Sequence, residues 1–155
     1  MKKLLGMILT LALAAGLAWP VYAESSTVPP EVTAHAYLVM DAQTGQVLVQ
    51  KGGAERNYPA SITKIMTLAL AMEKCGGDMT QQVTVSPDAV YSLEAGSSHV
   101  ALQPGEVVSL NDLFHATILA SANDAANVLA EYTAGSMEAF VELMNAKAAE
   151  LGLAG

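Results

Sequence analysis

The feature that most constrains the fold of this chain is the order of its secondary-structure signals, in which two adjacent β-prone runs precede a series of helical patterns. Residues 36–40 (AYLVM) and 46–50 (QVLVQ) flank residues 41–45 (DAQTG), whose Asp and Gly suit a tight turn. The two runs therefore predict a β-hairpin. Because an isolated two-stranded ribbon is only marginally stable in water, the order predicts an α+β domain with further strands from beyond residue 155.

Apolar residues at helical spacing predict four helices after the hairpin. The predicted helices span residues 62–73, 110–120, 124–133 and a segment that runs from Ser136 to Leu151. Ser109 precedes the second helix with Asp112 three residues later, which is a variant of the capping box, and Ser136 is the expected N-cap of the fourth. Residues 83–85 predict a short strand.

The first 23 residues predict a cleaved signal peptide. Lys2 and Lys3 give a basic start, residues 4–17 are almost entirely apolar, and the segment ends in the small residue Ala23. A membrane anchor is the alternative, but the apolar run is shorter than the roughly 20 residues that span a bilayer. We therefore expect an exported, extracytoplasmic protein in which residues 24–34 form a flexible start and residues 35–155 belong to the folded domain.

The mature chain would be strongly acidic. It keeps 5 of the 7 basic residues and all 15 acidic residues, which gives a formal net charge of −10. Because proteins bind phosphate backbones chiefly through Lys and Arg, this charge argues against nucleic acid as a partner. The three histidines share no metal-ligand spacing, and Cys75, the only cysteine, lies in an apolar helical run that predicts a buried side chain. We expect neither a metal site nor a cofactor.

A nucleophile and a base are predicted at the start of the first helix. Ser61 and Lys64 form a Ser-x-x-Lys sequence, and residues three apart on a helix lie on one face. A serine hydroxyl needs a neighbouring base, and a lysine amine can serve when burial or nearby positive charge lowers its pKa. The helix N-terminus would also stabilise negative charge on an attacked carbonyl. Alone, this spacing is weak evidence, since Ser and Lys are common residues.

A second polar pair lies between the second and third predicted helices. The Ser121 hydroxyl is a candidate for relaying a proton from Lys64 to a leaving amine, and the Asn123 amide is a candidate for binding substrate backbone. The alternative is that Ser121 or Asn123 only caps the following helix. Ser109 opens a second Ser-x-Asn sequence in the same chain, and we assign that serine to capping and Ser121 to chemistry.

The segments around these residues resemble one enzyme family. Residues 59–67 (PASITKIMT) closely resemble the active-site segment of the D-alanyl-D-alanine carboxypeptidases, the low-molecular-mass penicillin-binding proteins, and residues 119–126 (LASANDAA) resemble their second motif. Shorter similarities in the same order extend the resemblance from about His35 to Gly152. The segment around Ser61 is its most specific part.

The resemblance implies a β-lactamase/transpeptidase-like fold, with a helical cluster packed on an antiparallel sheet. It also implies a serine-type carboxypeptidase that removes the terminal D-alanine from peptidoglycan stem peptides in cell-wall synthesis and remodelling. Ser61 would be the nucleophile, Lys64 the general base and Ser121 the proton relay, while Asn123 would bind substrate. Penicillins and other β-lactams would acylate Ser61, and no cofactor would be needed.

One family motif is absent from the chain. The resemblance implies a Lys-Thr-Gly strand that binds the substrate carboxylate and supplies half of the oxyanion hole, but the sequence contains neither Lys-Thr nor Lys-Ser. We therefore expect residues 35–155 to be the N-terminal portion of the domain and to be inactive alone. Many family members also carry a C-terminal amphipathic helix, through which peripheral membrane association would arise in a segment absent from this chain.

Two other functions remain open at this point. A serine β-lactamase would need a carboxylate for deacylation, and Glu142 stands three residues before Asn145 as in such an enzyme. A solvated Glu on a helix is the simpler interpretation. A non-catalytic penicillin-binding or regulatory module is the other alternative, and an intact or disrupted Lys-Thr-Gly after Gly155 would distinguish it from the enzyme.

Overall fold

The structure is a computed structural model that describes residues 31–153. The predicted signal peptide and residues 24–30 of the predicted flexible start lie outside the described residues, and residues 31–34 have no regular secondary structure. Within residues 31–153, no helix is long and apolar enough to cross a membrane. The chain divides into two compact units at Glu55 and Arg56, which we call the hairpin unit and the helical body.

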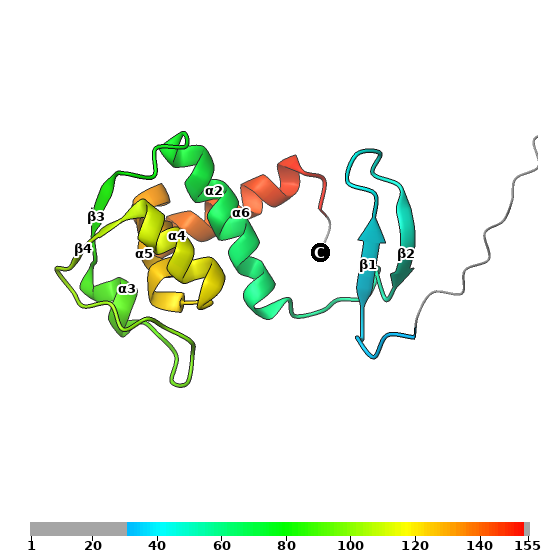
Figure 1. Ribbon diagram of the computed structural model, residues 1–155, viewed down its shortest axis with the longest axis horizontal. Coiled ribbons are helices and arrows are strands. Elements are labelled where there is room, and N and C mark those ends of the chain that lie inside the picture. The colour runs from blue at the N-terminus through cyan, green and yellow to red at the C-terminus, as the bar shows by residue number, and fades with distance from the viewer. Residues whose placement is uncertain (1–30, 154–155) are drawn as a thin grey trace, which may run out of the picture. The chain divides into compact units, whose positions relative to one another are not determined.

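The hairpin unit consists of two antiparallel strands, β1 (Tyr37–Met40) and β2 (Val47–Lys51), as the sequence predicts (Figure 1). Asp41 closes the turn, because its Oδ1 accepts hydrogen bonds from the backbone N–H groups of Gln43 at 3.0 Å and Thr44 at 2.7 Å. Gly45 has φ +73°, a conformation that glycine adopts without steric penalty. The turn therefore depends on the two residue types that predicted it.

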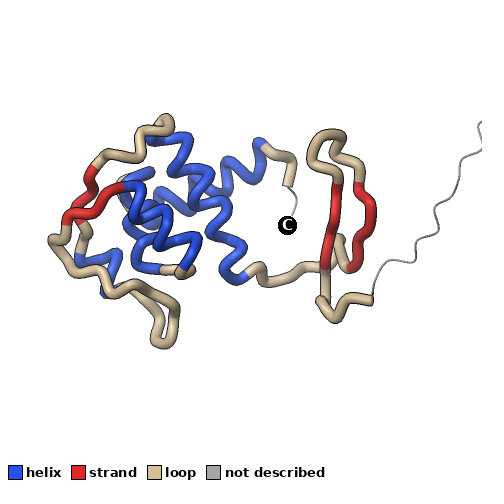
Figure 2. The backbone as a smooth tube through the Cα atoms, in the orientation of Figure 1, coloured by secondary structure: helices blue, strands red, loops and turns tan. Residues whose placement is uncertain are grey.

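The helical body contains the four predicted helices and one short pair of strands (Figure 2). In chain order its elements are η1 (Ala60–Ile62), α2 (Thr63–Cys75), β3 (Gln82–Thr84), α3 (Pro87–Tyr91), β4 (Val107–Ser109), α4 (Leu110–Leu119), α5 (Asn123–Ala134) and α6 (Met137–Glu150). The strand predicted at residues 83–85 is present and pairs antiparallel with β4. Elements α3 and β4, which are only five and three residues long, were not predicted from the sequence.

Helix α5 is the centre of the helical body, since it contacts α2, α3, α4 and α6. Its apolar residues pack in a core with α2 and α4, where Leu110, Leu113 and Leu129 have no exposed surface. A smaller cluster joins Leu70 and Phe140. Cys75 is buried in the main core, as predicted. The core therefore holds α5 against α2, and the candidate site lies between these two helices.

Two helices begin at the predicted caps. The Ser109 Oγ accepts a hydrogen bond from the Asp112 N–H at 3.1 Å and caps α4, and Ser136 caps α6 in the same way.

The buried face of α2 is less obvious from its sequence. Its most buried residues include Lys64 and Thr67, whereas Ile62 and Ile65 are 68% and 63% exposed.

Candidate active site

Ser61 lies in the single 3₁₀ turn that leads into α2, so it stands at a helix start as the sequence predicts. The residue before it, Ala60, has φ +48°, in the left-handed region that non-glycine residues rarely occupy. Such backbone strain costs on the order of 1 kcal/mol and is common at functional sites. The Ser61 side chain is exposed. The turn thus presents the hydroxyl at the surface of the helical body.

Ser121 reaches Ser61 from a segment 60 residues away. The Ser121 hydroxyl donates a hydrogen bond to Ser61 Oγ at 2.8 Å. Ser121 also has a left-handed backbone, with φ +54°, in the turn between α4 and α5. The N-cap of α5 is Ala122, which makes no side-chain capping bond, so the capping alternative for Ser121 and Asn123 is wrong.

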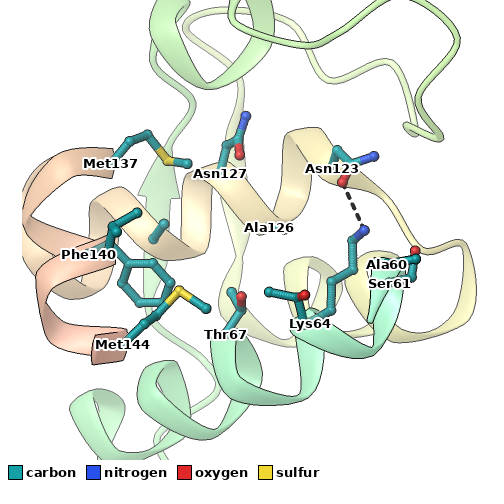
Figure 3. A pocket seen from close by; sticks show the side chains of 13 residues that line it. Ala60, Ser61, Lys64, Thr67, Asn123, Ala126, Asn127, Met137, Phe140 and Met144 are labelled. Carbon is teal, nitrogen blue, oxygen red and sulfur yellow. Dashed lines mark hydrogen bonds between the residues drawn. The ribbon is translucent and has the colours of Figure 1, made fainter. Parts of the chain in front are cut away.

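Lys64 is held by Asn123, as Figure 3 shows. The Lys64 Nζ donates a hydrogen bond to Asn123 Oδ1 at 2.8 Å, and no hydrogen bond joins Lys64 to Ser61 in the part of the chain that the structure describes. Lys64 is only 9% exposed. Burial disfavours the charged ammonium and lowers the pKa of Lys64 below its ordinary value of 10.5. The neutral amine is therefore easier to reach than in an exposed lysine.

A cavity of about 360 Å³ begins at these side chains and extends between α2, α5 and α6. One end is polar, with Ser61, Lys64 and Asn123, and the other end is formed by apolar side chains of α6 (Figure 3). The lining residues on α6 are Met137, Phe140, Val141 and Met144. The cavity is large enough to admit a small part of a peptide next to the Ser61 hydroxyl.

The arrangement brings together two hydroxyls and an amine, which are among the groups that acyl transfer uses. An exposed hydroxyl is hydrogen-bonded to a second hydroxyl, and a buried amine with a lowered pKa lies one helical turn away. The sequence analysis placed Ser61, Lys64, Ser121 and Asn123 here, but it assigned no role to Ser98, whose carbonyl oxygen binds Asn123. It also did not place α6 in the cavity. No sequence pattern marks either contact, because both depend on how the helices pack.

The site offers no metal-binding set. Among residues 31–153, no group of three or more His, Cys, Asp and Glu side chains is placed to hold a metal ion.

Comparison with known proteins identifies the relatives of this chain. Residues 23–155 match the family described as D-alanyl-D-alanine carboxypeptidase. The chain is 42% identical to D-alanyl-D-alanine carboxypeptidase DacC of Escherichia coli (strain K12) over 137 residues, which cover 84% of this chain and 34% of the relative. It is 34% identical to D-alanyl-D-alanine carboxypeptidase DacF of Bacillus subtilis (strain 168), over 99% of this chain and 40% of that protein.

A solved structure with a similar fold is penicillin binding protein 6B from Escherichia coli. The TM-score is 0.75 at 37% sequence identity, over 84% of this chain and 43% of that one. This similarity confirms the predicted penicillin-binding-protein fold. The chain spans 34% and 40% of the length of the two curated relatives DacC and DacF.

Proposed function

The chain belongs to the D-alanyl-D-alanine carboxypeptidase family, and from that premise we propose that it carries the nucleophile side of a serine D-Ala-D-Ala carboxypeptidase. In this proposal, Ser61 forms an acyl-enzyme with peptidoglycan stem peptides and releases their terminal D-alanine. The activity serves cell-wall synthesis and remodelling, and penicillins inhibit it by acylating the same serine.

The observation that carries the proposal is the meeting of two short motifs from distant parts of the chain. Ser61 and Lys64 come from η1 and α2, whereas Ser121 and Asn123 come from the turn before α5 and from its first residue. Each member of one pair is hydrogen-bonded to a member of the other, both at 2.8 Å. Chance occurrences of Ser-x-x-Lys and Ser-x-Asn would not be expected to pair in this way.

The geometry supports the following order of events. The Ser61 oxygen attacks the carbonyl carbon of the penultimate D-alanine, and the proton of Ser61 passes to the neutral Lys64 amine. The tetrahedral intermediate then collapses, the peptide C–N bond breaks, and the Ser121 hydroxyl relays the proton to the departing amine. Water finally attacks the ester, which releases the shortened peptide and restores the Ser61 hydroxyl.

Lys64 and Asn123 have separate roles in this scheme. Burial lowers the pKa of Lys64, so the fraction of neutral amine at a given pH exceeds that of an exposed lysine. Acylation should therefore rise with pH until Lys64 is deprotonated, with its half-maximum below pH 10.5. The Asn123 amide holds the Lys64 amine and borders the cavity, and in this proposal it binds substrate backbone there.

Full turnover requires more than the four side chains described. The Lys-Thr-Gly motif that the family resemblance implies does not occur in these 155 residues. The proposed reaction therefore needs a carboxylate-binding group and a second oxyanion donor from residues outside them. Loss of one such donor alone typically lowers the rate about 10²- to 10³-fold, so residues 24–155 by themselves should be inactive.

We also propose that residues 1–23 direct export and are then removed, which would place the site outside the cytoplasm with its wall substrate. The support is the basic start and the apolar run of the sequence. N-terminal sequencing of the protein recovered from cells tests this proposal, since a mature chain that begins at Glu24 is expected. A chain that retains Met1 would contradict it.

The β-lactamase alternative receives no support from the site. Glu142, the carboxylate on which it depended, is exposed, and the cavity is lined by its neighbours Val141 and Met144 instead. A non-catalytic module would bind penicillin without releasing D-alanine, so the two assays described next separate it from the enzyme.

The test uses the full-length protein and a fluorescent penicillin. Ser61→Ala should abolish covalent labelling and leave the thermal melt unchanged, because only an exposed hydroxyl is removed. The matched control is Ser109→Ala, which removes the serine of the other Ser-x-Asn sequence. It should keep labelling while it lowers the free energy of unfolding by about 1 kcal/mol through loss of the α4 cap.

Release of D-alanine from a diacetylated D-Ala-D-Ala tripeptide measures turnover in the same variants. Labelling of Ser61→Ala at the wild-type level would eliminate Ser61 as the nucleophile. Labelling of the wild type without D-alanine release would favour the non-catalytic module.

A further inference from the structure

Asp124, the residue after Asn123, is a buried carboxylate that the proposed mechanism does not use. It has no exposed surface. Within residues 31–153 it forms no ion pair, and its oxygens accept hydrogen bonds from backbone N–H groups of Val100 at 3.2 Å, Leu102 at 3.0 Å and Ala125 at 2.9 Å. A buried polar side chain is costly unless it is hydrogen-bonded, and these three backbone donors satisfy the Asp124 oxygens. Two of them belong to one loop that precedes β4.

The same loop also binds Asn123. The carbonyl oxygen of Ser98 accepts hydrogen bonds from the Asn123 backbone N–H at 2.8 Å and from its side-chain Nδ2 at 3.1 Å. Since the amide nitrogen is engaged by Ser98, the amide oxygen points the other way, toward the Lys64 Nζ (Figure 3). The reversed amide would place its NH₂ group against the ammonium and its oxygen against the Ser98 carbonyl. The Ser98 contact therefore fixes which end of the amide meets Lys64.

The backbone of this loop is strained next to the residues that bind Asp124. Ala101, between the two residues that donate to Asp124, has φ +61°. The residues on either side of Ala101 both donate their backbone N–H groups to Asp124, while the Ala101 N–H itself donates to His99 Nδ1 at 3.1 Å. The conformation is unfavourable for alanine, so it persists only where surrounding contacts determine it. The hydrogen bonds from Val100 and Leu102 to the Asp124 carboxylate hold the backbone on both sides of Ala101.

We propose that Asp124 is a positioning residue for the active site, which acts through the loop from Ser98 to Leu102 and the Asn123 amide to orient the Lys64 amine. The inference rests on the proposed function, in which Lys64 takes the proton of Ser61. It assigns Asp124 no contact with substrate. Its effect on the reaction passes entirely through Asn123.

A double-mutant cycle in the full-length protein separates this role from a purely structural one. The measured quantity is the second-order rate constant for acylation by a fluorescent penicillin in the wild type, Asp124→Asn, Asn123→Ala and the double variant. Asp124→Asn places an NH₂ group among backbone N–H donors, and the displaced loop should lower acylation about 100-fold. In the Asn123→Ala background, the same change should lower acylation by less than about threefold, because its route to Lys64 is already broken.

Two matched variants keep the test informative if Asp124→Asn does not fold. Ala101 is exposed, so Ala101→Val disturbs the loop and leaves the buried Asp124 side chain unchanged, because a β-branched residue resists positive φ. Ala101→Gly accepts the same φ and should retain wild-type acylation, whereas Ala101→Val should lower it about tenfold. Thr117→Val controls for a change in the buried core, since the Thr117 Oγ1 is buried and has no hydrogen-bond partner in the part of the chain that the structure describes. It should leave acylation unchanged.

The outcomes distinguish this inference from the proposed function. Persistent labelling of Ser61→Ala would overturn the proposed function. If labelling depends on Ser61 but the Asp124→Asn and Asn123→Ala effects multiply independently, the positioning role alone fails. Wild-type acylation in Ala101→Val, or an equal loss in Thr117→Val, would also overturn it.

Discussion

The hairpin unit and the helical body differ in what holds them together. In the helical body, helices α2, α4 and α5 enclose a core in which Leu110, Leu113 and Leu129 have no exposed surface. No residue of the described hairpin unit is buried, and its apolar side chains Leu38 and Leu48 are 51% and 62% exposed. Within residues 31–153, the helical body thus has a hydrophobic core of its own, whereas the contacts of the hairpin are those of strand pairing and its turn.

The proposed active-site residues lie in only one of the two units. All four proposed active-site residues belong to the helical body, and helix packing determines where they meet. A site held to tenths of an ångström needs side chains locked by their surroundings, which a marginal two-stranded ribbon does not offer. The predictions below test this division by changing matched residues in the two units.

The largest effect is expected from replacing a lysine in each unit with arginine. Lys64→Arg should lower acylation by penicillin at least about 1,000-fold, or about 4 kcal/mol of barrier, because a guanidinium stays protonated and cannot accept the Ser61 proton. Lys51→Arg in the hairpin, whose amine donates to the Ala34 carbonyl alone among residues 31–153, should change the rate less than about twofold. Stopped-flow acylation measures both, with a thermal melt to check folding of the buried variant.

An acylation rate for Lys64→Arg within about tenfold of the wild type would show that Lys64 acts only as a charge. An equal loss for Lys51→Arg would remove the proposed division between the units.

A smaller effect is expected on stability when one leucine in each unit is truncated. Leu113→Ala should lower the free energy of unfolding by about 3 kcal/mol, because it leaves a cavity in a closed core. Leu48→Ala, on an exposed strand position, should lower it by less than about 0.5 kcal/mol. Urea unfolding of both variants provides the comparison. A loss for Leu48→Ala as large as that for Leu113→Ala would mean that the hairpin is covered in the folded protein.

The smallest effect is expected from acid titration of the hairpin turn. Hydrogen bonds from the Thr44 backbone and side chain, and from the Gln43 backbone, lower the pKa of Asp41 below its ordinary value of 3.8. Its folded pKa is depressed, so its contribution to the turn is complete above about pH 3.8 and is lost as the pH falls through the folded pKa. The amide resonances of Gln43 and Thr44 should shift in that window, and Asp41→Asn should remove the shift.

Asp78 in the helical body provides the matched control for this titration. The hydrogen bonds of Thr80 likewise lower the pKa of Asp78. Each carboxylate should affect only the amides of its own turn, because both are exposed and local. An Asp41 that titrates at or above pH 3.8 would contradict the hydrogen bonds that define the turn.

Local physics made much of the fold predictable from the sequence. The Asp and Gly of residues 41–45 determine a turn, and helical spacing with serine N-caps determines where α4 and α6 begin. The short elements α3 and β4 were missed because their few residues carry too little periodic signal. The position of Ser61 at a helix start, three residues before Lys64, was also predictable, because it is a local property of the sequence.

Only the tertiary structure decided which of these local possibilities is used. Both Ser-x-Asn sequences precede or open a helix, but Ser109 caps α4 while Ser121 is hydrogen-bonded to Ser61, because the packing of α5 against α2 brings only the second sequence to Ser61. The same packing buries Lys64 and leaves Ile65 exposed, against the order of their hydrophobicity. Burial and hydrogen bonding between distant segments are properties of packed surfaces, so no local pattern around Lys64 or Asp124 encodes them.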